Sequence, residues 1–193
     1  MDLRADIARC RLCGKRFAAS KSAHEPRPVI WFEKGAPIRL IGQAPGARVH
    51  ETGLPFDDRS GERLRDWLEL DRTRFYDRNL LAITPMAFCF PGYNAHGADL
   101  PPPPLCARTW AGPVQDYLGP ARLTLLVGGY AQKWHLQSRA PVTETVANWR
   151  ALAPGIFPLP HPSWRNTAWL RKNPWFADEL LPALRARVRE VLK

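Results

Sequence analysis

The sequence predicts an α/β fold in which helices cover both faces of a four-stranded parallel sheet. Short apolar segments alternate with helical segments in the order β-α-β-α-β-α-β, and this alternation favours a parallel sheet. The apolar fraction of 45% is ordinary for a globular chain, and no apolar run approaches the ~18 residues of a membrane-spanning helix. We therefore expect a three-layer α/β/α sandwich that receives ligands outside the carboxyl ends of its strands.

Four short segments rich in aliphatic side chains are the expected strands. The first covers residues 38–42 and runs into the turn-forming residues 43–46, so a site is expected at its carboxyl end. The other three cover residues 79–84, 122–128 and 155–160.

Helical periodicity marks the segments between and after the strands. In residues 60–70, Leu64, Trp67 and Leu68 fall on one face of a helix. The other expected helices cover residues 105–118, 129–136 and 175–192. The four prolines at 101–104 form a stiff connector rather than a domain boundary, so we expect a single domain over residues 1–193.

The charge of the chain indicates a polyanionic partner. Lysine and arginine number 28 against 18 aspartates and glutamates, which gives a net charge of +10, and such a basic surface attracts nucleic acid. The first residues include acids where a secretory signal would be basic and then apolar. We expect a cytoplasmic monomer with no membrane partner.

Four cysteines point to a metal centre. Cys10 and Cys13 form a C-x-x-C pair, whereas Cys89 and Cys106 lie far downstream. A reducing compartment argues against two disulfides, and a buried unpaired cysteine does not explain a C-x-x-C pair. Four thiolates suit either zinc or an iron–sulfur cluster, and the composition does not choose between them.

Three loops carry the remaining motifs. They read G-Q-A-P-G at 42–46, G-L-P-F at 53–56 with Ser60-Gly61 following, and H-P-S at 161–163. In this order, with the two cysteine pairs in place, they resemble the uracil-DNA glycosylases, and in particular their four-cysteine branch. The resemblance implies a four-iron four-sulfur cluster on the four cysteines, with zinc as the alternative. It also implies a monofunctional base-excision repair enzyme that hydrolyses the N-glycosidic bond of uracil in DNA and leaves an abasic site.

The resemblance and the chemistry of base release together suggest roles for individual residues. His161 follows a strand end, and its neutral imidazole would stabilise the base as it departs with negative charge. Phe56 would stack on a base that has been rotated out of the duplex. Gln43 would orient water. The expected base-binding residues are Gly42, Ala44, Phe56 and Pro85.

Residues beside these loops are expected to hold the DNA backbone. Ser60 would head a helix whose free amides can receive a phosphate, and Ser163 would pinch the backbone similarly. Trp164 or Arg165 would fill the gap left by the rotated nucleotide. The expected DNA-binding set is Arg59, Ser60, Ser163, Trp164, Arg165 and Asn166, and Arg63, Arg171 and Lys172 would extend the basic track.

Three positions depart from the pattern of the family. The first loop has Ala44 in place of an aspartate that activates water in the best-known members. Gln43 replaces the glutamate of the four-cysteine branch, and an amide cannot accept a proton at neutral pH. Pro85 replaces the asparagine that reads uracil. We therefore expect relaxed base choice that includes hypoxanthine and xanthine, read partly through backbone groups.

A catalytically silent module that binds damaged or single-stranded DNA is the alternative, because Ala44 and Pro85 remove two groups expected of active relatives. His50 and Glu51 could replace the missing base, but both are expected on the solvated surface, and His96 and His135 are set aside as surface or structural residues. A zinc deaminase and a dinucleotide-binding dehydrogenase are excluded, because H-x-E with P-C-x-x-C and G-x-G-x-x-G are missing.

Overall fold

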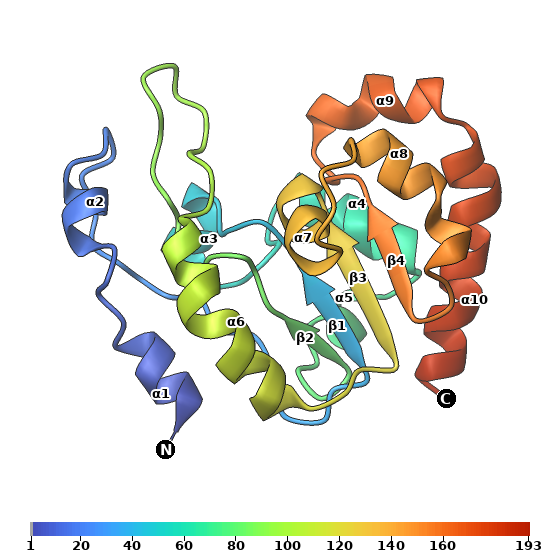
Figure 1. The fold of residues 1–193 in the computed structure, drawn as a ribbon, viewed down its shortest axis with the longest axis horizontal. Helices are drawn as coiled ribbons and strands as arrows, with labels where there is room; N and C mark the ends of the chain where they lie inside the picture. The colour runs from blue at the N-terminus through green and yellow to red at the C-terminus, as the bar shows by residue number, and fades with distance from the viewer. Residues whose placement is uncertain (1) are drawn as a thin grey trace.

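A four-stranded parallel sheet organises the chain in the computed structural model, which describes residues 2–193 (Figure 1). The strand order is β2-β1-β3-β4, and every neighbouring pair is parallel. The strands are β1 (Ile38–Ile41), β2 (Leu81–Ile83), β3 (Leu123–Val127) and β4 (Ile156–Leu159). The four expected strands and the expected fold class are therefore confirmed.

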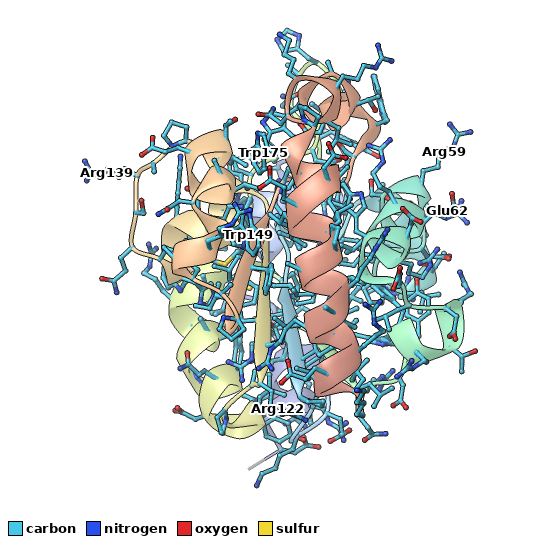
Figure 2. The ribbon with its side chains drawn as sticks, turned by 90° about the vertical axis from the view of Figure 1, so that its right-hand side faces the viewer. Arg59, Glu62, Arg122, Arg139, Trp149 and Trp175 are labelled. Carbon is cyan, nitrogen blue, oxygen red and sulfur yellow. The ribbon has the colours of Figure 1, made fainter. Side chains whose placement is uncertain are left out.

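Helices cover both faces of this sheet. Figure 2 shows the sheet between a layer that contains α4 (Arg59–Leu68) and α10 (Leu181–Val191) and a layer that contains α6 (Pro104–Leu118) and α7 (Gly129–His135). The shorter helices are α1 (Leu3–Ala8), α2 (Gly14–Ala18), α3 (Ala47–Thr52), α5 (Arg72–Phe75), α8 (Val142–Ala147) and α9 (Thr167–Lys172). Two 3-10 turns cover Trp149–Ala151 and Trp164–Asn166.

The central strands are buried on both faces, which explains their nearly continuous apolar sequences. Ile38 and Leu40 of β1 belong to the core that contains Leu184 of α10. Ile41 belongs to a second core with Ala131 of α7. Successive side chains of a strand point to opposite faces of the sheet, so β1 contributes side chains to both cores.

The long helices lie where periodicity predicts them, at α4, α6 and α7. The expected helix at 175–192 forms as a π-helical turn over Phe176–Leu180 that continues into α10. The six short helices were not predicted, because four to six residues are too few to show a helical period. No helix within residues 2–193 has the length and apolar character needed to cross a membrane.

The strand order creates a crevice at the carboxyl edge of the sheet. The chain leaves β1 for β2 on one side and returns to β3 on the other, so the connections diverge between β1 and β3. Buried Gln132 ties the neighbouring strand ends together, since its amide donates to the carbonyls of Leu126, at 3.3 Å, and Leu159, at 2.9 Å. The loop that carries His161 thus begins at the end of β4, which Gln132 holds in place.

Candidate active site

A cavity of about 610 Å³ lies at this edge of the sheet, a volume within the usual range for ligand pockets. The loops after β1 and β4 line it, together with the turn before α4 and the segment after β2. The sequence-predicted residues that line it are Gly42, Gln43, Ala44, Phe56, Arg59, Ser60, Pro85, His161, Ser163, Trp164 and Arg165. Of the expected active-site residues, only Asn166 does not line the cavity.

The loop after β4 fixes the proton position on His161. The backbone N–H of Ser163 donates to Nδ1 of His161 at 3.2 Å. A nitrogen that accepts a hydrogen bond carries no proton, so the neutral ring is protonated at Nε2. Burial lowers the pKa of His161 below its usual value of 6.5, and the Asp58 carboxylate opposes this shift. The ring is therefore a neutral donor at neutral pH.

Two side chains brace the His161 loop. The Asn166 amide donates to the His161 carbonyl at 2.7 Å, so it holds the loop from behind. Arg63 of α4 donates to the Ser163 carbonyl at 2.9 Å and to the Thr167 hydroxyl at 3.3 Å. Arg63 therefore joins α4 to the histidine loop, and its place in a basic phosphate track stays a prediction.

Phe56 forms a wall of the cavity in an unusual backbone conformation. Its ring lies over Gly42, where an added Cβ would be 3.3 Å from Cζ of the ring. Its φ of 55° is in the left-handed region, which a bulky residue rarely adopts. The Tyr76 hydroxyl donates to its carbonyl at 3.2 Å, and Gly61 packs so closely that a Cβ there would lie 1.7 Å from the same oxygen. The contacts of Tyr76 and Gly61 therefore hold Phe56 in this strained backbone conformation.

The backbone N–H groups near Pro85 are already used. Those of Met86 and Ala87 donate to the carbonyls of Gly42 and Gln43 at 2.9 and 3.1 Å. By contrast, the N–H groups of Gln43 and Ala44 donate to no other group in residues 2–193. Of these two segments, the first loop therefore has the free backbone donors and the segment around Pro85 does not.

The start of α4 differs from the expectation for Ser60. The helix begins at Arg59, and Asp58 caps it by accepting the Gly61 N–H at 2.9 Å. Ser60 lies within the first turn, so the expectation that it heads the helix is wrong. The Asp58 carboxylate takes an amide that a phosphate would otherwise use.

Sequence reasoning missed two carboxylates that line the cavity, Asp58 and Asp99. Asp58 precedes R-S-G-E, so the capping rule could have identified it. Asp99 lies in the loop between the last two cysteines and has no local signal. At the rim, Arg59 projects outward from α4 (Figure 2), and Trp164 is 72% exposed.

The histidines outside the cavity have other surroundings. His50 is half-buried against His24, with ring centroids 5.0 Å apart, and burial lowers its pKa. The expectation that His50 is solvated is therefore wrong. Glu51 is exposed, as expected, and neither residue lines the cavity. His96 and His135 are also exposed and outside it.

Residues 30–185 match the family model described as the uracil DNA glycosylase superfamily. The chain belongs to this superfamily. Membership of this superfamily supports DNA glycosylase activity, which is the hydrolysis of N-glycosidic bonds in DNA. The matched range contains every residue that lines the cavity except Val29, and it also contains Cys89 and Cys106. Cys10 and Cys13 precede it.

The four cysteines of this glycosylase-superfamily chain line one small, largely apolar cavity as free thiols. Burial raises the pKa of Cys89 to about 12 and that of Cys106 to about 11, and the neighbouring thiols add to both shifts. Within residues 2–193, no three His, Cys, Asp or Glu side chains are close enough to hold a single metal ion. Four convergent thiols are a donor set that zinc or an iron–sulfur cluster can use.

Gly61→Ala is expected to destabilise the protein by ~1–3 kcal/mol or more, because the new Cβ overlaps the Phe56 carbonyl. Denaturant unfolding measures this change in the free energy of unfolding. Gly112→Ala in α6 is the control, since a Cβ there meets nothing within 4 Å. Equal stability of Gly61→Ala and the unmodified protein would contradict the close packing that holds Phe56.

The imidazole of His161 is expected to titrate below pH 6.5, with its proton on Nε2 in the neutral form. Asp58→Asn should lower this pKa further, because the carboxylate favours the imidazolium. Nitrogen-15 NMR of the ring across the pH range measures both the pKa and the tautomer. A pKa above 6.5, or a proton on Nδ1, would contradict the assigned geometry.

Proposed function

We propose that this superfamily member removes uracil, and other deaminated bases such as hypoxanthine and xanthine, from DNA. It hydrolyses the N-glycosidic bond and leaves an abasic site. The observation that carries the proposal is that a neutral Nε2–H donor, on His161, and the ring of Phe56 line the same cavity.

Binding begins with rotation of the target nucleotide out of the base stack, since its glycosidic bond is not accessible within the duplex. Stacking on Phe56 contributes ~1–3 kcal/mol and does not depend on the hydrogen-bonding edge of the base. Trp164, which is exposed and lines the cavity, or its neighbour Arg165 would occupy the gap that the base leaves. The rim guanidiniums of Arg48, Arg59 and Arg165 neutralise phosphates.

Bond cleavage places negative charge on the base and positive charge on the sugar. His161 donates through Nε2–H to a carbonyl oxygen of the departing base, and this bond strengthens as the charge develops. The Ser163 N–H and the Asn166 amide hold the ring and its loop before substrate arrives. The ring therefore needs no reorientation during the reaction.

Selection of deaminated bases follows from the donors in the cavity. Deamination replaces an exocyclic amine, a donor, with a carbonyl oxygen, an acceptor. The free N–H groups of Gln43 and Ala44 can donate to such an oxygen, whereas an amine would leave them unpaired. Pro85 offers no side-chain amide to restrict the choice to uracil, so several deaminated bases fit.

The proposal includes a four-iron four-sulfur cluster on Cys10, Cys13, Cys89 and Cys106. It is supported by the convergence of all four free thiols on one cavity. When bound, the cluster would supply a covalent cross-link between the amino-terminal segment, the segment after β2 and the first turn of α6. The hydrolysis itself does not pass through it.

Base release from oligonucleotides with a single lesion tests the activity. The unmodified protein is expected to release uracil, hypoxanthine and xanthine, and His161→Ala to slow single-turnover release by ~10²–10³-fold with DNA affinity retained. His135→Ala, outside the cavity, is the control. DNA binding without release of any base would favour the silent binding module, and release of uracil alone would contradict the relaxed base choice.

Iron and sulfide analysis of protein purified without oxygen tests the cluster. We expect about four irons and four sulfides per chain and a visible thiolate-to-iron absorption band. Cys89→Ser is expected to lose the band and most of the iron. One zinc per chain without iron would contradict the cluster and assign the thiols to zinc.

A further inference from the structure

Hydrolysis is faster when a group accepts a proton from the attacking water, and neither the first loop nor the His161 loop supplies such a group. Ala44 has no polar side-chain atom, and the amide of Gln43 cannot accept a proton at neutral pH. The Nδ1 lone pair of His161 already accepts the N–H of Ser163. The candidates for this group are the carboxylates that line the cavity.

Two carboxylates line the cavity, and their surroundings differ. Asp58 caps α4 through its bond with the Gly61 N–H at 2.9 Å. The carboxylate of Asp99 makes no hydrogen bond or ion pair of 4.0 Å or less within residues 2–193. Its Oδ2 lies against the first loop, 3.8 Å from where a Cβ on Gly46 would be. Asp99 therefore has free lone pairs beside the loop that would position water.

A closed hairpin over residues 91–100 presents Asp99. It rises beside α3 on the same side as the carboxyl ends of the strands (Figure 1). Asp99 pairs with Tyr93 in an antiparallel bridge, and the Leu100 N–H donates to the Gly92 carbonyl at 2.8 Å. The Asn94 side chain accepts the N–H groups of two residues across the turn, at 2.9 and 3.0 Å. The hairpin thus holds the backbone of Asp99 and leaves its carboxylate without a partner among the described residues.

We propose that Asp99 is the general base of the hydrolysis, an inference that rests on the proposed function. The C1′–N bond breaks and the base leaves with the electron pair. The water oxygen bonds to C1′ while one proton passes from that water to the Asp99 carboxylate. Solvent then takes this proton and supplies one to the anionic base. The carboxylate also stabilises the positive charge that develops on the sugar.

The charges around Asp99 support this role. Loss of hydration raises the pKa of its carboxyl, the Asp58 carboxylate adds to this, and Arg165 opposes it. A more basic carboxylate accepts a proton from water more readily. The other charged or titratable groups at the cavity are Arg48, Arg59 and His161. Because only the ionised form is a base, release should slow as the pH falls through the raised pKa of Asp99.

Single-turnover release of uracil by four variants and the unmodified protein tests this assignment. Asp99→Asn is expected to slow release by ~10²-fold or more without weakening DNA binding, and to remove the acid limb of its pH profile. Asp99→Glu should restore part of the rate. Asp58→Asn should retain most of it, because asparagine also caps helices. Asp116→Asn, exposed on α6, is the matched control and should match the unmodified protein.

The outcomes separate this inference from the function on which it rests. An unmodified protein that releases uracil, with Asp99→Asn equally fast and an unchanged pH profile, overturns the role of Asp99 alone. A large loss in Asp58→Asn with none in Asp99→Asn overturns it too and assigns the proton to Asp58. No release by the unmodified protein overturns the proposed function and this inference together. Thermal unfolding confirms that each variant is folded.

Discussion

The hydrogen bond from the Ser163 N–H to Nδ1 of His161 determines what chemistry the cavity can perform. It places the proton on Nε2, and burial lowers the pKa so that the ring stays neutral. A neutral donor suits a leaving group that becomes anionic, since no proton need be transferred to stabilise it. The same bond occupies the lone pair of His161, so any proton acceptor for the attacking water is a separate group.

The first turn of α4 connects the two walls of the site. Gly61 packs against the Phe56 carbonyl and holds that residue in its strained conformation. Two residues later, Arg63 bonds to the Ser163 carbonyl in the histidine loop. Asp58 caps the same turn and acts on the pKa of His161. One helix terminus therefore sets the spacing between the aromatic wall and the imidazole.

Local patterns in the sequence were sufficient for the strands and the longer helices, because buried strands are apolar and amphipathic helices are periodic. The order of the motifs was sufficient to predict nearly all of the residues that were expected at the cavity and that line it. The contacts of Arg63 with the histidine loop join residues about a hundred positions apart, and no local pattern encodes them. Asp99 was missed for the same reason, since its hairpin reaches the first loop only in the folded chain. The half-buried position of His50 likewise depends on His24, which lies outside its helix.

A crystal structure with DNA that contains 2′-fluoro-2′-deoxyuridine tests the central claim most directly, because the fluorine disfavours the cationic sugar and slows cleavage. The uracil is expected outside the duplex, stacked on Phe56, with a carbonyl oxygen about 2.7–3.1 Å from Nε2 of His161. A uracil that remains in the stack, or that occupies another site with His161 Nε2 unpartnered, would contradict the account.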